Sequence, residues 1–392
     1  MADVARGSVA SDRADGSALI KTAAQRLGFE LCGITPATSP SGFQHLERWL
    51  DQGLDGSMHY IGGRRAAYEH PHSVLSGVRS LIVVGINYAT REPSPIAAGE
   101  GRVSRYAWGT RDYHDVIRDK LRELASVLHE KWPGCRTRGV VDTAPLLERD
   151  FAQLAGLGWF GKNTLLINKH KGSWLFLAAL LTDLELAADE PHHASHCGTC
   201  RLCLDACPTD AFVEPYVLDA RKCISYLTIE LRNQPVPSAL RPGMEDWLFG
   251  CDICQDVCPW NRRAPRSSCA DFQPRDDLHP LDAVELLSLD EESFRARFRQ
   301  SPLLRPGRSG MLRNAAIVLG NSRNRRFVSA LQTALSDADP IVRGAVAWAL
   351  GQLGGSQAVM ALKQRLLQES CQDVCCEIEA AVAGISHANS EG

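Results

Sequence analysis

Two cysteine runs decide the fold of the central part of this chain. The first is Cys197-Gly-Thr-Cys200-Arg-Leu-Cys203-Leu-Asp-Ala-Cys207-Pro208, and the second is Cys251-Asp-Ile-Cys254-Gln-Asp-Val-Cys258-Pro259. The first run has the spacing of bacterial ferredoxins, in which three cysteines on one tight loop bind one [4Fe–4S] cluster and the fourth binds a second cluster. We therefore expect a ferredoxin-like module with two [4Fe–4S] clusters over residues 191–275.

The second run is incomplete, because Leu248 stands where its first cysteine would be, and Cys223 is the obvious replacement. Crossed ligation then predicts two sets of four ligands: Cys197, Cys200, Cys203 and Cys258 for one cluster, and Cys207, Cys223, Cys251 and Cys254 for the other. Zinc and disulfides are the alternatives, but a zinc site does not account for the triple Cys-x2-Cys-x2-Cys followed by Cys-Pro. The remaining cysteines are expected to be small buried apolar residues: Cys32, Cys135, Cys269, Cys371, Cys375 and Cys376.

The composition describes an ordinary globular protein of two or three domains. It has 392 residues, 44% hydrophobic and 23% charged, with 14 cysteines and a net charge of −3. Residues 1–17 lack the apolar core of a secretory signal, and the longest apolar stretch, 174–186, is too short and too polar to span a bilayer. We expect a cytoplasmic protein with no membrane contact, residues 1–17 forming a disordered extension. In that compartment many cysteines indicate metal or redox chemistry.

Residues 18–190 alternate between helical and strand patterns, which predicts an α+β or α/β domain. Helical spacing covers 18–27, 43–52 and 115–131, whereas 29–34, 80–88, 140–141 and 173–181 resemble strands. Neither a Gly-x-Gly-x-x-Gly turn nor a phosphate-binding Walker loop is present, which argues against an NAD or ATP enzyme. Because clusters carry single electrons, this domain is expected to hold the reaction centre.

Three polar segments interrupt the apolar pattern of that domain, at 104–115, 141–149 and 158–164. Asp112 precedes a helix and is suited to cap it. Asp142 ends a strand, where it is either a proton donor with a pKa raised by apolar surroundings or a helix cap before Pro145. Gly158 and Gly161 indicate close backbone approach or a plain turn.

The C-terminal part is a helical repeat with arginine as its dominant charge. Residues 312–320 recur at 342–351 and, more weakly, at 374–384, which predicts a HEAT-like solenoid over 310–388 after a basic linker at 276–309. Between Arg295 and Phe327 there are nine arginines and no Asp, Glu or Lys. Arginine suits bidentate phosphate contacts. We therefore expect nucleic-acid contact through Arg295, Arg297, Arg299, Arg305, Arg308, Arg313, Arg325, Arg326 and Arg343.

In combination, these motifs resemble the epoxyqueuosine reductases, which complete queuosine synthesis in tRNA and are similar in their core to reductive dehalogenases. The resemblance covers nearly all of the chain after residue 17 and rests on the segments 108–116, 141–143, 161–163, 223–228 and 251–261 and on the repeat tail. It implies a monomer that binds cobalamin and two [4Fe–4S] clusters, takes electrons from an external donor and reduces an epoxide on the wobble nucleoside of tRNA.

The resemblance also implies roles for individual residues. Asp142 would be the general acid, and Arg149 a second active-site residue. Cobalamin contacts would come from Ser104, Arg105, Asp142, Asn163, Leu166, Leu177 and Ser225. This chain departs from the family pattern at Tyr68, where an arginine is frequent, although Arg64 and Arg65 are near, and one residue is inserted within 109–111.

Two other functions are compatible with parts of the sequence. One is a dehalogenase-like corrinoid enzyme that acts on a small molecule, but such a substrate needs neither the arginine-only segment nor the solenoid. The other is a ferredoxin-type electron carrier with an interaction domain. The residues around Asp142 and the large N-terminal half argue against it.

Overall fold

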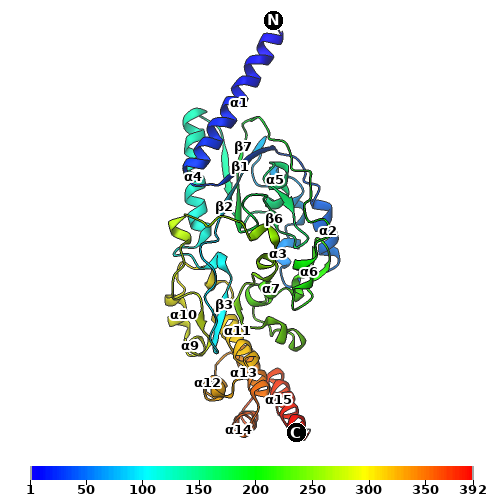
Figure 1. Ribbon diagram of the computed structural model, residues 1–392, viewed down its shortest axis with the longest axis vertical. Coiled ribbons are helices and arrows are strands. Elements are labelled where there is room, and N and C mark those ends of the chain that lie inside the picture. Colours follow the sequence, from blue (N-terminus) through cyan, green and yellow to red (C-terminus); the bar gives the residue numbers. More distant parts are fainter. Residues whose placement is uncertain (1, 391–392) are drawn as a thin grey trace.

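The computed structural model of the chain describes the backbone of residues 2–390 and the side chains of residues 14–386. The molecule is elongated, with a mixed helix and strand part at the N-terminal end and a stack of helices at the C-terminal end (Figure 1). The expected three-part architecture, α+β domain, two-cluster module and helical repeat, is confirmed.

The N-terminal domain is built on a four-stranded sheet in the order β1-β2-β7-β4, with every neighbouring pair antiparallel. Its strands are β1 (Leu31–Pro36), β2 (Ser80–Asn87), β4 (Thr137–Val140) and β7 (Leu175–Thr182). All eight residues of β2 are buried, as its unbroken apolar run predicts.

Helices cover both faces of this sheet. On one face lie α1 (Ala2–Arg26) and α4 (Tyr113–Lys131), and the leucines of α4 at 121, 124 and 128 are buried there. On the other face lies α5 (Glu148–Leu154). Smaller elements complete the domain: α2 (Phe43–Asp51), α3 (His59–Gly62), η3 (Arg105–Ala107), β5 (Trp159–Phe160) and β6 (Leu166–Ile167).

The expected disordered extension at residues 1–17 is wrong for the part that the structure describes, because α1 begins at Ala2; Met1 lies outside the described residues. Near position 17 the helix is packed against the domain. Gly16 lies against the ring of Trp132, and the Ser17 hydroxyl donates to the carbonyl of Ala187 at 3.0 Å.

In the cluster module two short helices, α6 (Leu202–Asp205) and α8 (Ile253–Asp256), pack together. Each lies within one of the two cysteine runs. The module also contains β8 (Phe212–Glu214), β9 (Val217–Leu218), α7 (Ile224–Ile229) and β10 (Trp247–Phe249). Strand β3 (Glu100–Val103) from the N-terminal domain pairs with β10 on one side and with β11 (Leu281–Asp282) on the other. The domain and the module therefore share a sheet.

The segment expected as a basic linker, 276–309, is folded. It contains β11, α9 (Ala283–Leu287), α10 (Glu291–Arg297) and η9 (Pro302–Leu304). Leu286, Phe294 and Phe298 are buried in the core that this segment shares with the module and the tail. The many arginines of the segment drew attention away from its apolar residues, which are an integral part of that core.

The tail is the expected stack of paired helices: α11 (Gly307–Asn321), α12 (Val328–Ala334), α13 (Pro340–Leu353), α14 (Ser356–Leu366) and α15 (Gln372–Ser390). Helix α13 packs between α11 and α15 (Figure 1). Helix α11 also packs on β10. A side chain at Gly320 would clash with Trp348 and Ala349, so this glycine permits the close approach of α11 and α13.

Candidate active site

The structure brings together the first expected set of cysteines. Cys197 and Cys258, 61 positions apart in the sequence, pack in one small cluster with Trp159, Ile167 and Trp260. Burial, followed by the neighbouring thiols of Cys258, Cys197 and Cys200, raises the pKa of Cys203 to about 11. The last cysteine of the second run thus lies beside the first run, and the assignment of these four cysteines to one cluster stays a prediction.

The second set converges around Cys254. Burial raises the pKa of this thiol well above its usual value, and the thiols of Cys223, Cys203 and Cys207 add to the effect. The pKa of Cys251 is raised in the same way by burial and then by Cys254 and Cys223. Cys223 takes part although it lies in neither run, whereas Leu248 is buried in β10.

These cysteines suit a cluster in their chemistry. All 14 cysteines are free thiols. Among the residues that the structure describes, no three His, Cys, Asp or Glu side chains are grouped as ligands of one metal ion. A cubane cluster makes a different demand, since each of its four thiolates binds a different iron.

The other six cysteines correct our expectation of burial. Cys376 is exposed, and the remaining five are only partly buried. Sequence context did not distinguish half-buried from buried sites, because a small thiol is tolerated in both.

Asp142 lies directly after β4 and Val141, with a left-handed backbone conformation (φ 53°). The Tyr113 hydroxyl donates to its Oδ2 at 2.8 Å, and His114 Nε2 lies 3.5 Å from the same oxygen. The third neighbour is Arg305, whose Nη1 is 3.8 Å away. Asp142 is not a helix cap, because Leu147 occupies the N-cap position of α5.

The charge state of Asp142 differs from our expectation of a raised pKa. Burial alone would raise it, but hydrogen bonds from His114 and Tyr113 and the charge of Arg305 outweigh burial and lower the pKa of the carboxyl. Solvent also reaches the group, since 52% of its side chain is exposed. Asp142 is therefore an anion in this arrangement, because Tyr113, His114 and the charge of Arg305 all favour the charged form.

Two groups beside Asp142, His114 and Glu148, have raised pKa values and therefore hold a proton more readily than they would in water. Burial lowers the pKa of His114, but hydrogen bonds to Asp112 and Asp142 outweigh it and raise the pKa overall. Burial and the charge of Asp142 raise the pKa of Glu148 to about 8, and its Oε1 has no hydrogen-bond partner.

The start of α4 fixes this arrangement. Asp112 caps the helix, as one interpretation of the sequence predicted, by accepting from the backbone N–H of His114 at 2.9 Å. The same oxygen, Oδ1, lies 2.7 Å from His114 Nδ1. The Tyr113 ring is stacked between His114, at 4.0 Å between centroids, and Phe176, at 4.2 Å. Both donors to Asp142 are thus held rigidly.

Three residues expected to contact cobalamin, Ser104, Arg105 and Asn163, form side-chain hydrogen bonds with the second cysteine run. The Ser104 hydroxyl donates to Asp252, and Arg105 Nη1 donates to Asp252 at 3.2 Å and Asp256 at 2.6 Å. Asn163 Nδ2 donates to the carbonyl of Cys254 at 3.3 Å. These segments shape the wall beside Cys251 and Cys254.

The remaining expected contacts provide apolar side chains and one hydroxyl, which are compatible with a partly apolar cofactor. Leu166 and Leu177 belong to one apolar cluster with Leu146 and Ala144, which follow Asp142 closely in the chain. Ser225 is half-buried in α7, two residues after Cys223. An apolar wall beside a carboxylate and hydrogen-bonding segments is typical of cofactor sites.

Tyr106 lies between Tyr113, which binds Asp142, and Phe249, which precedes the second cysteine run. Its ring lies edge-on to Tyr113 at 5.9 Å and 5.8 Å from Phe249, two residues before Cys251. Burial raises its pKa far above the usual value, so it stays neutral. Asp142 and the second cysteine set therefore lie on two sides of one half-buried tyrosine.

Arg149 and Arg64 hold the loops around Asp142. Arg149 Nη1 donates to the carbonyl of Thr164, in the turn between β5 and β6, and Arg64 Nη1 donates to the carbonyl of Thr143 at 3.3 Å. Arg64 thus reaches this site from the segment just before Tyr68.

The arginines predicted to contact nucleic acid separate into two groups. Arg313 and Arg343 are buried, with 1% and 7% exposure, and Arg308 is paired with Asp337. They are structural, and their inclusion in a binding surface is wrong. Arg297 pairs with Glu285 at 2.7 Å, and Arg305 lies at Asp142. The arginines still exposed are Arg295, Arg299, Arg325 and Arg326.

Sequence reasoning assigned no role to Tyr113, His114 or Glu148 and placed Arg305 elsewhere. The signal for the first two was the Asp112-Tyr113-His114 sequence at a helix start. No local pattern connects Arg305 to Asp142, because 163 positions separate them.

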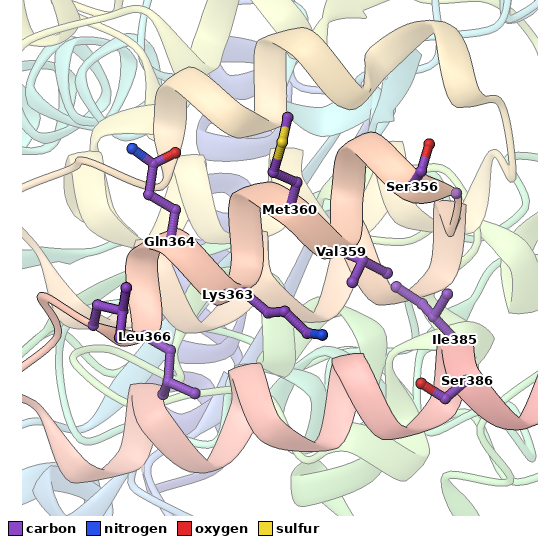
Figure 2. Close-up of a pocket in the computed structure, with 10 residues that line it drawn as sticks. Ser356, Val359, Met360, Lys363, Gln364, Leu366, Ile385 and Ser386 are labelled. Carbon is purple, nitrogen blue, oxygen red and sulfur yellow. The ribbon is translucent and has the colours of Figure 1, made fainter.

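A groove between α14 and α15 lies far from these residues, at the C-terminal end of the tail (Figures 1 and 2). Its lining is mainly apolar, with Lys363 as the one charged side chain among the lining residues. None of the described lining residues is a carboxylate or a thiol.

Comparisons with known proteins agree with this architecture. Family models for "Epoxyqueuosine reductase QueG, DUF1730", a 4Fe-4S double cluster binding domain and HEAT repeats match residues 69–143, 196–261 and 306–381. An epoxyqueuosine reductase of Xanthomonas campestris is 40% identical over 88% of this chain and 98% of its own. One of Pseudomonas aeruginosa is 42% identical over 86% and 94%. The chain belongs to the epoxyqueuosine reductase family.

As a member of the epoxyqueuosine reductases it is an enzyme of the oxidoreductase class. A crystal structure of an epoxyqueuosine reductase with an epoxyqueuosine-modified tRNA-Tyr stem loop matches it with a TM-score of 0.86 and 28% identity, covering 94% of this chain and 98% of the other. A Bacillus subtilis family member, with its catalytic aspartate loop swung out of the active site, matches equally well. No helix within the described part of this chain is long and apolar enough to cross a membrane.

Proposed function

We propose that this enzyme reduces epoxyqueuosine to queuosine at the wobble position of tRNA, with Asp142 passing protons to the epoxide oxygen. The observation that carries the proposal is the Asp142 carboxylate, bonded by Tyr113 and approached by a proton-holding His114, in a chain whose relatives are named epoxyqueuosine reductase. The solved relative with a modified stem loop supports the choice of substrate.

The reaction converts an epoxide to an alkene, which consumes two electrons and two protons and releases water. Asp142 delivers a proton to the oxygen as the strained C–O bond opens, because an alkoxide would otherwise be the leaving group. Since Asp142 is ionised at rest, the first proton comes from His114, whose ring Asp112 orients. The second proton, which releases the oxygen as water, follows the same route after His114 has taken up a proton from solvent. Tyr113 keeps the carboxylate in place.

Cobalamin, when bound, would supply a strongly reducing cobalt to the epoxide, and the two [4Fe–4S] clusters would supply its electrons singly from an external donor. Asp142, Leu166, Leu177 and Ser225 would contact the cobalamin, and Ser104, Arg105 and Asn163 would shape its wall through their bonds to the second cysteine run. Arg149 and Arg64 hold the loops that close around the site. The chain would act as a monomer.

The test is mass analysis of tRNA nucleosides after incubation with the reconstituted enzyme and a reductant. We expect conversion of epoxyqueuosine to queuosine, and a single-turnover rate lower by about 10²–10⁴ in Asp142→Asn. Arg122→Gln, on the exposed side of α4, is the matched control. Unchanged epoxyqueuosine with the intact enzyme would refute the proposal, and full activity of Asp142→Asn would refute the acid role.

A further inference from the structure

Arg305 differs from the other arginines of its segment. Arg308 donates to both carboxylate oxygens of Asp337, and Arg313 donates to three backbone carbonyls. Arg305 instead lies between two carboxylates at longer range, 3.8 Å from Asp142 and 3.5 Å from Glu230. Charge-assisted hydrogen bonds are normally about 2.7–2.9 Å long, so both contacts are loose.

The guanidinium of Arg305 therefore has N–H donors available for a ligand. It carries five N–H donors, and none of them forms a hydrogen bond with the described residues. Its side chain is 34% exposed, so a ligand can reach it. A planar cation with free donors beside the reaction centre is suited to bidentate binding of a phosphate group.

The position of Arg305 in the chain connects two parts of the molecule. It follows η9 directly and precedes α11, so it belongs to the segment with exposed arginines, yet its side chain reaches the acid at the end of β4. It is the one arginine of residues 295–326 that pairs with Asp142 among the described contacts.

We propose that Arg305 forms an ion pair with the Asp142 carboxylate in the free enzyme. When the substrate binds, the Arg305 side chain exchanges this partner for a backbone phosphate of the RNA. This inference rests on the proposed function and deepens it, because it makes the release of the acid depend on the RNA. Arg305 is a positioning residue for Asp142 and a contact for the RNA backbone.

The consequence is a change in the protonation of Asp142. In the free enzyme the charge of Arg305 is one of the causes that lower the pKa of this carboxyl. When a phosphate neutralises Arg305, that contribution disappears and the pKa rises, which favours the protonated acid that the reaction needs. The other ionisable groups that face the site are Tyr60, Tyr68, Tyr106, Tyr113, His114, Glu148 and Glu230.

Binding of RNA should therefore be linked to proton uptake. The experiment is isothermal titration calorimetry of the cluster-loaded enzyme with an unmodified anticodon stem-loop RNA, in buffers of different ionisation enthalpy, between pH of about 4.5 and 7. We expect uptake of a fraction of a proton per RNA by the wild type and by Arg122→Gln, and its loss in Asp142→Asn and Arg305→Gln. In Arg305→Gln the slope of log affinity against log salt should fall by about 1, as expected for one lost phosphate contact.

Arg305→Lys keeps the charge and is expected to keep the wild-type salt slope, which guards against misfolding of the glutamine variant. Proton uptake that persists in Arg305→Gln, or an unchanged salt slope in that variant, would overturn the inference. Equal uptake with inorganic phosphate alone would reassign the ligand to a free anion and overturn the RNA contact. Absence of RNA binding by the wild type would instead refute the proposed function itself.

Discussion

Arg313 offers the sharpest test of how the tail is attached to the rest of the enzyme. Its guanidinium donates to the carbonyls of Leu231 at 2.6 Å, Leu227 at 2.7 Å and Gln234 at 2.8 Å, and its side chain is 1% exposed. These three acceptors lie in and after α7. We expect Arg313→Met to destabilise the fold and to leave RNA affinity unchanged.

The magnitude follows from two opposing effects. A buried carbonyl left without its donor costs about 1–3 kcal/mol, so three of them cost about 6 kcal/mol at mid-range. Removing the cation also relieves a penalty, because burial lowers the pKa of Arg313 well below its usual value, to about 10, and this shift corresponds to about 3 kcal/mol. The free energy of unfolding should therefore fall by about 3 kcal/mol.

The assay is anaerobic urea denaturation of the cluster-loaded enzyme, followed by far-ultraviolet circular dichroism, together with RNA binding under native conditions. Arg299→Met is the matched control, because Arg299 is exposed. We expect the control to keep the wild-type denaturation midpoint and to bind RNA more weakly. If Arg313→Met had the stability of the control and bound RNA more weakly, Arg313 would be a binding residue and our reasoning would be wrong.

Three further predictions concern the cluster ligands, His114 and the ion pair of Arg343 in the tail. Crossed ligation predicts that Cys258→Ala combined with Cys197→Ala lowers iron from about 8 to about 4 atoms per chain, whereas Cys258→Ala combined with Cys254→Ala removes nearly all of it; iron analysis with the reverse result would show uncrossed ligation. The raised pKa of His114 stabilises the fold below its unfolded value of about 6.5, and this contribution is lost as pH rises through the folded pKa. Urea midpoints measured across that range should therefore lose part of their pH dependence in His114→Gln, and an unchanged profile would contradict the ion pair. Arg343 shares the fully buried carboxylate of Glu369 with Arg365, so Arg343→Gln should lower the free energy of unfolding by about 2 kcal/mol through the loss of charged hydrogen bonds; unaltered thermal unfolding would exclude this role.

Much of the fold was predictable because its signals are local. The apolar run of β2, the leucines of α4 and the repeated helices of the tail each reflect a period that a few consecutive residues define. Likewise, the spacing within each cysteine run is a property of one tight loop. The matched cluster and HEAT models agree with these predictions.

The charge state of Asp142 was not predictable in the same way. Sequence placed the residue at a strand end and suggested a raised pKa, but the sign depends on which donors surround it. Tyr113 and His114 come from α4, and Arg305 comes from a segment 163 positions later. Their combined effect reverses that of burial, because each favours the charged form.

The arginines show the same division. By itself, the sequence determined that residues 295–326 carry arginine as their only charge, which is a matter of composition. Only the tertiary structure decided that Arg313 is buried on backbone carbonyls, that Arg305 faces Asp142 and that Arg299 is exposed. A side chain's identity is local, whereas its partners and its access to water depend on segments that folding brings together from distant parts of the chain.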